Sequence, residues 1–248
     1  MTKSFLFALG LGFMACSCSG QKQGQTGTDA PANTLSKKEK AAGWKLLFDG
    51  TSTSGWHTYG ETTAGTAWKA VDGTLELDAD AKSGSATGGD LVSDEEYGNF
   101  ELQLDWKISQ KGNSGVCLYV IDNKEKYKYM WYTGLEMQIL DNDGHPDGKI
   151  TKHRAGDLYD IIKSSSEPVK AVGEWNHVAI KSLNGKLDFF LNGVHIVDTQ
   201  LWDDNWRTLV AGSKFKNLPD FMAFKSGRIG LQDHGNTVWF RNIKVRRL

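Results

Sequence analysis

Apolar and polar residues alternate with a period of two in several short segments after residue 43. The clearest alternation covers residues 100–108, where Phe100, Leu102, Leu104, Trp106 and Ile108 are separated by charged or amide side chains. Successive side chains of a strand point to opposite faces, so this pattern predicts a strand with one buried face. Similar segments occur at 116–120, 135–140, 178–180, 187–191, 194–197, 228–231 and 238–245.

Glycine, asparagine and aspartate clusters separate these segments, as expected of turns. Asn192-Gly193 between two alternating segments is typical of a type I′ hairpin. Only residues 201–208 suggest a helical turn, so we predict an all-β fold made of two packed antiparallel sheets. The expected buried residues between the sheets are Leu102, Leu104, Trp106, Val116, Leu118, Met137, Ile139, Leu231 and Phe240.

The N-terminal residues follow a different pattern. Lys3 precedes an apolar run from Phe5 to Ala15, which is too short to span a bilayer and is typical of a signal peptide. The cysteines that end this run resemble a bacterial lipobox, with Cys16 favoured for lipidation and Cys18 as the alternative. We therefore expect a lipoprotein signal peptide at 1–18 and a protein held in the cell envelope by its lipid anchor alone, on the periplasmic side rather than the cell surface.

Residues 19–42 consist mainly of Gln, Gly, Thr, Ser, Lys and Ala, a composition too polar to bury a face. This segment is expected to be a flexible tether, followed by one β-sandwich domain at 43–248. Cys117 is the only cysteine after Cys18, so no disulfide framework is expected in the domain. Its stability must therefore come from the apolar core.

The charge balance excludes one class of partner. The chain has 29 Lys and Arg against 30 Asp and Glu, for a formal net charge of -1. Without a basic surplus to attract phosphates, nucleic acid is not an expected partner. Its 9 tryptophans suit a protein that stacks rings against sugars, although most of them are expected in the core.

Eight short motifs occur in order along the chain. They are Leu46-Leu47-Phe48-Asp49-Gly50 with Gly55-Trp56, Gly89-Asp90-Leu91-Val92, Glu96-Tyr97-Gly98-Asn99-Phe100-Glu101-Leu102, Gly112-Asn113-Ser114-Gly115, Glu136-Met137-Gln138-Ile139-Leu140-Asp141, Gly173-Glu174-Trp175-Asn176, Leu191-Asn192-Gly193 and Gly230-Leu231-Gln232-Asp233-His234-Gly235. Together they resemble the 3-keto-disaccharide hydrolase family, which has a concanavalin A-like or laminin G-like jelly-roll. The resemblance extends from Trp44 to Leu248, with one departure: relatives often carry Arg where this chain has Tyr119.

The resemblance implies an oligosaccharide or glycoside substrate whose sugar is oxidised at its third carbon. A ketone there acidifies the proton on the neighbouring carbon, so a base can remove it, the enolate can expel the aglycone and water can add back. Such a site needs a base, an enolate stabiliser and a proton donor. It does not need the closely spaced carboxylate pair of a retaining glycosidase.

The strand at 135–140 and the loop after it carry candidates for this chemistry. Strand parity places Glu136 and Gln138 on one side, where Glu136 is expected to act as a base or to hold the ligand. His145 and His234 are candidates for proton transfer, because imidazole titrates near neutral pH. The expected substrate-binding residues are Asn113, Tyr119, Gln138, Arg154, Tyr159 and Asp233, with Arg154 able to pair an enolate oxygen and Asp233 able to pair with His234.

We expect one pocket to unite Glu136, Gln138, His145, Arg154, Tyr159 and His234. A divalent cation is the only candidate cofactor, with Asp141 and Asp143 as its candidate ligands, although an Asx-rich turn is the default for that pair. Two other functions remain open: a lectin-like module that binds carbohydrate without turnover, and a conventional sandwich glycosidase. The apolar Leu140, where laminarinase-like enzymes carry an acid, argues against the latter.

Overall fold

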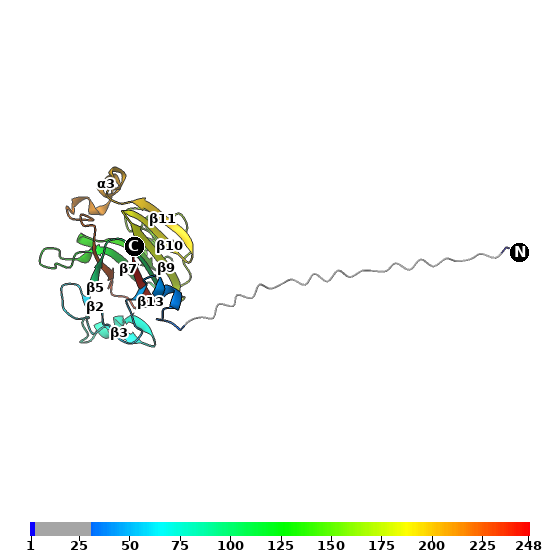
Figure 1. Cartoon of the computed structure of the whole chain (residues 1–248), viewed down its shortest axis with the longest axis horizontal. Coiled ribbons are helices and arrows are strands. Elements are labelled where there is room, and N and C mark those ends of the chain that lie inside the picture. Colours follow the sequence, from blue (N-terminus) through cyan, green and yellow to red (C-terminus); the bar gives the residue numbers. More distant parts are fainter. Residues whose placement is uncertain (3–30) are drawn as a thin grey trace.

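The computed structural model describes residues 1–2 and 31–248, and 31–248 form two antiparallel sheets packed face to face (Figure 1). The eight-stranded sheet has the order β11-β10-β9-β6-β13-β4-β3, with β1 paired to β13. These strands are β1 (Lys45–Leu46), β3 (Trp68–Val71), β4 (Thr74–Leu77), β6 (Phe100–Ile108), β9 (Asn176–Leu183), β10 (Lys186–Leu191), β11 (Val194–Gln200) and β13 (Val238–Arg247). The five-stranded sheet has the order β2-β5-β12-β7-β8. Its strands are β2 (Trp56–Thr58), β5 (Leu91–Tyr97), β7 (Asn113–Val120), β8 (Leu135–Leu140) and β12 (Gly227–Leu231).

The predicted jelly-roll class and every predicted strand are confirmed. The predicted strand at 100–108 is β6, and the one at 135–140 is β8. The expected core is also present, because none of its nine residues is more than 1% exposed. The predicted helical turn lies slightly later, as α3 (Asp204–Ala211), which begins after the capping side chain of Asp203 and lies beside β11 in Figure 1.

Short helices occupy the connections. They are α1 (Lys37–Ala41), α2 (Ala79–Lys82) and the 3₁₀ helices η1 (Met130–Tyr132), η2 (Pro146–Lys149) and η3 (Lys214–Asn217). In the part of the chain that the structure describes, no helix is long and apolar enough to cross a membrane. The expected lipidation sites Cys16 and Cys18 lie outside the described residues.

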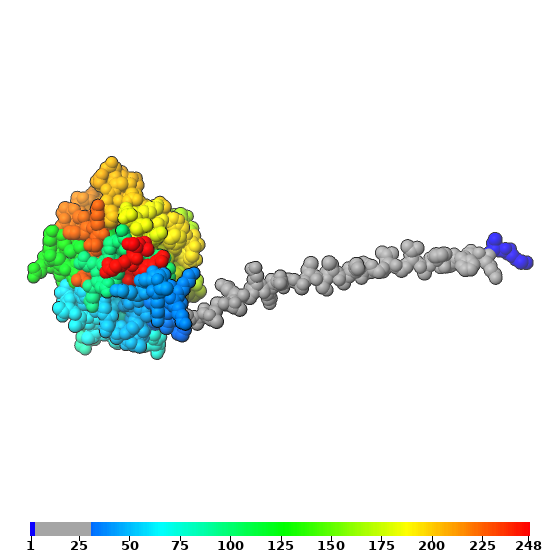
Figure 2. Space-filling view, in the orientation of Figure 1, coloured from blue at the N-terminus to red at the C-terminus, as the bar shows by residue number. Residues whose placement is uncertain are grey.

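The ordered contacts of the domain begin before the expected boundary at Gly43. Asn33 is buried, and its backbone N–H and side-chain oxygen pair reciprocally with Asn242 at 2.7 and 2.8 Å. Its amide also donates to the carbonyl of Gly73. Figure 2 shows residues near 31–50, in blue, against the C-terminal residues, in red, which agrees with the pairing of β1 and β13. The tether expectation is therefore wrong for residues 31–42, because side-chain amides rather than apolar residues attach this polar segment.

The two faces of the five-stranded sheet have different roles. Val116 and Leu118 of β7 point into the core between the sheets, whereas Cys117 belongs to a separate apolar cluster on the other face. Opposite Cys117 in the neighbouring strand lies Glu136, and opposite Gly115 lies Gln138. Loops cover this outer face, so all residues of β7 and β8 are buried. The candidate chemistry therefore lies between the outer face of this sheet and its covering loops.

Candidate active site

A cavity of about 150 Å³ lies over the outer face of β7 and β8. The strands contribute its floor, while the covering loops and the segment after β12 contribute its walls. Its lining consists of Asn113, Trp131, Glu136, Gln138, Tyr159, Lys214, Phe215, Gln232 and His234. Five of the residues expected in the site therefore share one cavity: Asn113, Glu136, Gln138, Tyr159 and His234.

The carboxyl group of Glu136 lies over Gly115, where the neighbouring strand has no side chain. A Cβ atom at Gly115 would lie 2.1 Å from Oε1 of Glu136, so only glycine leaves room for the carboxyl group in this position. None of the described residues donates a hydrogen bond to this carboxyl group, and the residue is 5% exposed. Burial raises the pKa of Glu136 to about 8, and the nearby Lys214 offsets only part of this effect. Most molecules therefore carry a protonated Glu136 at neutral pH.

Lys214 and Tyr159 form a second part of the cavity wall. Nζ of Lys214 lies 3.9 Å from the centroid of the Tyr159 ring. Although much of Lys214 is exposed, partial burial lowers its pKa, and the nearby acids Glu136, Asp160 and Asp147 oppose that effect. Burial also raises the pKa of Tyr159, so its phenol keeps its proton. Besides the amide and ring N–H groups of its lining, the cavity thus contains a carboxylic acid, an ammonium and a phenol that can donate a hydrogen bond.

The strand itself positions Tyr159. Its backbone N–H donates to the carbonyl of Glu136 at 3.0 Å, which fixes this loop along β8. Its ring packs on His153, whose Nε2 lies 3.0 Å from the carboxylate of Asp160. Contacts within the protein therefore hold the Tyr159 ring, and its orientation toward the cavity does not depend on a ligand.

His234 and His145 meet at the edge of the cavity. The centroids of their rings are 6.0 Å apart, and the rings are nearly perpendicular. Partial burial lowers the pKa of His234, and the adjacent His145 lowers it further, so the neutral imidazole prevails at pH 7. His145 does not line the cavity; its Nδ1 accepts a hydrogen bond from the backbone N–H of Asp147 and caps η2.

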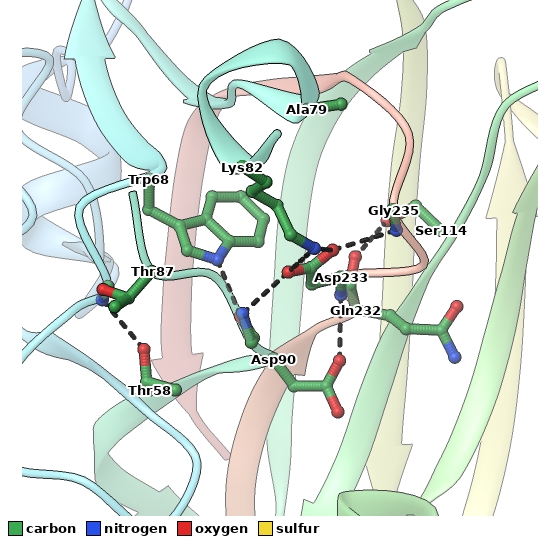
Figure 3. A network of polar contacts seen from close by, with 12 residues as sticks. Thr58, Trp68, Ala79, Lys82, Thr87, Asp90, Ser114, Gln232, Asp233 and Gly235 are labelled. Atoms are coloured by element: carbon green, nitrogen blue, oxygen red, sulfur yellow. Dashed lines mark hydrogen bonds and ion pairs between the residues drawn. The ribbon is translucent and has the colours of Figure 1, made fainter. Parts of the chain in front are cut away.

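A polar network holds the segment that carries His234 (Figure 3). Both carboxylate oxygens of Asp233 lie 2.6 Å from Nζ of Lys82, and they also accept hydrogen bonds from the backbone N–H groups of Gly89 and Gly235. The backbone N–H of Asp233 donates to Asp90. The Asp233 side chain is only 2% exposed. This network fastens the segment after β12 to the loop before β5, and thereby fixes the backbone next to His234.

Two polar atoms around the cavity have no partner among the described residues. They are Oδ1 of Asn113 and Oε1 of Gln232, both of which are buried. Gln138 differs, because its side-chain oxygen accepts a hydrogen bond from the backbone N–H of Ile139. Buried acceptors without a donor are costly, and the hydroxyl groups of a bound sugar would satisfy them.

A larger groove of about 720 Å³ adjoins this cavity. Trp131, Gln232 and His234 line both spaces, whereas Glu136, Tyr159 and Lys214 line the small cavity only. The groove continues over the loops around Thr63 and Gly88 and along Tyr129. A ligand longer than one ring could therefore extend from the cavity into the groove.

Tyr119 lies outside the cavity, contrary to the expectation that it lines the site. It has a positive φ of 62° at a β-bulge, where two residues of β7 lie between the partners of Arg228 and Gly230. The bulge turns Tyr119 into the core beside Leu118; it is 1% exposed, and its hydroxyl donates to the carbonyl of Gly98. In this chain Tyr119 is therefore a packing residue of the core.

Arg154, Asp233, Asp141 and Asp143 also lie outside the small cavity. The guanidinium of Arg154 pairs with Glu167 through Nε and Nη2, and its Nη1 donates to the carbonyl of Gly148. Asp233 pairs with Lys82 rather than with His234. The side chains of Arg154 and Asp233 are therefore occupied by contacts that support the loops.

The expected cation site takes the form of an Asx turn. The carboxylate of Asp141 accepts hydrogen bonds from the backbone N–H groups of Lys111, Asp143 and Gly144. Within residues 31–248, the group with suitable ligand atoms close together is Asp188, His195 and Asp198, which lies on β10 and β11 of the other sheet. The expectation of Asp141 and Asp143 as metal ligands is therefore not supported.

The sequence reasoning missed four residues of the lining: Gln232, beside the expected Asp233 and His234, and the three residues Lys214, Trp131 and Phe215. Lys214 and Phe215 lie in η3, and Trp131 lies in η1, so all three come from irregular covering segments without a strand pattern. The aromatic-rich sequence Tyr129-Met130-Trp131-Tyr132 was the one available signal.

We predict that Gly115→Ala lowers turnover at least tenfold with little loss of stability. The added methyl group would displace the Glu136 side chain from Cγ to the carboxyl group, and no backbone atom is among its three nearest contacts. Steady-state kinetics and thermal unfolding of the same preparation would check both parts. A variant with full activity would show that the position of this carboxyl group is unimportant.

Comparisons with known proteins identify the family of the chain. Residues 43–246 match the family described as the 3-keto-alpha-glucoside-1,2-lyase-like domain. A 3-keto-disaccharide hydrolase of Bacteroides thetaiotaomicron is 33% identical over 94% of this chain and 93% of its own length. A candidate glycosyl hydrolase of known structure from Parabacteroides distasonis is 29% identical, with a TM-score of 0.80 over 88% of this chain and 99% of that one. A second candidate glycosyl hydrolase from the same species is 28% identical, with a TM-score of 0.62 over 83% of this chain and 99% of that one. The chain therefore belongs to the 3-keto-alpha-glucoside-1,2-lyase-like family.

Proposed function

We propose that this protein cleaves glycosides whose sugar carries a ketone at its third carbon, by elimination of the leaving group followed by addition of water. One observation carries the proposal: a small cavity combines three hydrogen-bond donors, Glu136, Lys214 and Tyr159, with a neutral imidazole, His234. Enolisation of a ketone needs donors for its oxygen and a base for the proton on the adjacent carbon. Family membership and the name of the relative from B. thetaiotaomicron support the same chemistry.

The donors would bind the ketone oxygen at the inner end of the cavity. Negative charge develops on this oxygen when the neighbouring carbon loses its proton, and fixed donors in a site with little water stabilise that charge strongly. A protonated carboxyl group beside a tyrosine is a known arrangement for this purpose. In this assignment Lys214 takes the role that the sequence had suggested for Arg154, and Glu136 acts as a donor rather than as the base.

His234 would then move the proton. Its neutral imidazole accepts the proton from the second carbon, and the electron pair of that C–H bond forms the enolate. The enolate expels the group on the first carbon, and the new imidazolium gives its proton to the leaving oxygen. Water subsequently adds to the first carbon while a proton returns to the second, so the net reaction is hydrolysis. His145, in contact with His234, would tune this imidazole rather than touch the substrate.

The decisive experiment compares a glycoside with its 3-keto counterpart. We expect the protein to cleave only the oxidised sugar, because the plain sugar has no acidic proton on its second carbon. Cleavage of the plain glycoside would indicate a conventional sandwich glycosidase, and binding without cleavage would indicate a lectin-like module.

His234→Ala should lower kcat on the 3-keto substrate by about 10²–10⁴-fold.

We predict that the released 3-keto sugar carries deuterium at its second carbon when the reaction runs in deuterated water. The proton removed there exchanges with solvent, and the proton added back during hydration comes from solvent. Mass spectrometry and NMR of the product would locate the label, with the purified product incubated alone as the control for exchange. An unlabelled second carbon would instead indicate direct displacement at the first carbon.

We predict a bell-shaped pH profile of kcat/KM. On the acid side, activity falls as His234 gains a proton. Because the pKa of His234 is lowered, this fall occurs at a pH below the ordinary pKa of histidine. On the alkaline side, activity falls as pH rises through about 8, because the carboxyl group of Glu136 loses its proton. Glu136→Gln keeps a hydrogen-bond donor that does not titrate, so this variant should lose the limb near pH 8 and retain more activity than Glu136→Ala. Activity that rises through pH 8 would instead make Glu136 the base.

We also propose that the protein is a lipoprotein of the cell envelope, with its active domain on the periplasmic side. The support is the sequence alone, namely the apolar run that ends at Cys16-Ser17-Cys18. Replacing both cysteines by serine should abolish labelling with a radioactive fatty acid and release the protein from the membrane fraction. Labelling that survives the double change would exclude this anchor.

A further inference from the structure

Water that adds to the first carbon in the proposed reaction is expected to enter from the groove. The small cavity encloses about 150 Å³ and would hold the part of the sugar with the ketone, whereas the adjoining groove encloses about 720 Å³. His234 lines both spaces and can take one proton of this water. A bound water typically makes about three hydrogen bonds, so an acceptor on the groove side would fix its orientation.

Three carboxyl groups line the groove, and lysines pair with two of them. Nζ of Lys124 lies 3.4 Å from the carboxylate of Glu61, and Nζ of Lys82 lies 2.6 Å from that of Asp233. The third carboxyl group, of Asp90, takes part in no ion pair with any residue that the structure describes. Asp90 is therefore the acid of the groove that remains available to a polar ligand.

The carboxyl group of Asp90 uses one oxygen within the protein. Its Oδ1 accepts the backbone N–H of Asp233 at 2.9 Å, as Figure 3 shows. Within residues 31–248, its Oδ2 accepts no hydrogen bond. A single hydrogen bond thus joins Asp90 to the residue that precedes His234, and the second oxygen is left as an acceptor beside the proposed base.

The charge of Asp90 makes this oxygen a strong acceptor. Burial is the main cause that raises the pKa of Asp90, to about 6, and the hydrogen bond from Asp233 opposes it. The charge of Asp233 raises the pKa further, while Lys82 and Lys124 lower it. At neutral pH most molecules therefore carry an ionised Asp90, and hydrogen bonds to a carboxylate are stronger than those to a neutral oxygen.

We propose that Asp90 is a further catalytic residue, which holds the water that adds to the first carbon. This inference rests on the proposed function and assigns a residue to its hydration half. One hydrogen of the water binds Oδ2 of Asp90, and the other passes to His234 as the oxygen bonds to the first carbon. The electron pair of the double bond moves toward the ketone oxygen to form the enolate. The imidazolium then protonates the second carbon, so one water is consumed and both residues return to their starting states.

The test measures the two halves of the reaction separately on phenyl 3-keto-glucoside. Release of phenol reports elimination, and loss of the ultraviolet absorption of the unsaturated ketone reports hydration. Asp90→Asn keeps an oxygen for the N–H of Asp233 but replaces the second oxygen by an amide NH₂, which cannot accept a hydrogen bond. Since misplacing a reactant can cost about 10²-fold, hydration should slow by about this factor. Elimination should stay close to the wild-type rate, so the unsaturated sugar should accumulate.

Two further variants separate this role from a structural one. Glu61→Gln changes another carboxylate of the same groove, one already paired with Lys124, and should leave both halves unchanged. In Asp90→Ala, added formate should restore hydration, because a free carboxylate can occupy the space that the side chain leaves. The same formate should not restore it in Asp90→Asn, where the amide fills that space.

Equal slowing of both halves in Asp90→Asn would overturn the inference, since it would mean that Asp90 only positions His234. Unchanged hydration in this variant would overturn it as well, because the water would then be held elsewhere. Both outcomes leave the proposed reaction intact. If wild type releases no phenol from the 3-keto substrate, the proposed function itself fails, and this inference fails with it.

Discussion

The burial of the Glu136 carboxyl group without a protein hydrogen bond is the constraint on which the rest of the site depends. A carboxylate with little contact with bulk water is costly unless it is paired, and none of the described residues donates a hydrogen bond to this one. Protonation removes the charge, which explains why burial raises the pKa of Glu136 to about 8. Gly115 makes the position sterically accessible, and the two-sheet core supplies the stability that offsets its cost. A group held in an unfavourable state by the fold around it is typical of a site built for chemistry.

A nearby acid, Asp233, is in the opposite situation, because its carboxylate has several hydrogen-bond partners. Asp233 precedes His234 and has a lysine and two backbone N–H groups as partners. Its satisfied carboxylate fixes the backbone of the 232–235 segment, as Figure 3 shows. The structure thus shows two carboxyl groups in different situations: that of Asp233 is paired and holds the backbone beside His234 in place, while that of Glu136 has no hydrogen-bond partner among the described residues and faces the cavity.

The strands and the core could be predicted because alternation records which face is buried. The sequences of β6, β8 and β13 alternate clearly between apolar and polar residues, whereas β2 has only three residues and β5 contains four consecutive polar residues, 93–96. The sequence therefore shows no period-two pattern at β2 or β5, and β3 and β4 have only four residues each. Glu136 and Gln138 were found because strand parity places them on one face. Tyr119 was misplaced because parity fails at a bulge, which the sequence does not signal.

Lys214 and Arg154 show why the cation of the site could not be chosen from sequence. In the sequence, Arg154 comes soon after the strand that carries Glu136. Its guanidinium is nevertheless paired with Glu167. Lys214 is far away in sequence and carries no motif, yet its backbone N–H donates to Asp160 at 2.6 Å, and this contact brings η3 to the cavity. Proximity in the chain favoured the wrong residue, because contacts between loops, rather than strand pairing, decide which side chain reaches the site.

The division of the site into a small cavity and a larger groove meets two opposing demands of the proposed reaction. Hydrogen-bond donors stabilise an enolate best where water is excluded, since the local dielectric constant is then low. Hydration, in contrast, requires water at the first carbon after the leaving group has departed. If the leaving group occupies the groove, its departure opens a path for water at the one point where both spaces meet, beside His234. The inner donors remain shielded by the sugar ring while water enters from the groove, so the same imidazole can serve both halves of the reaction.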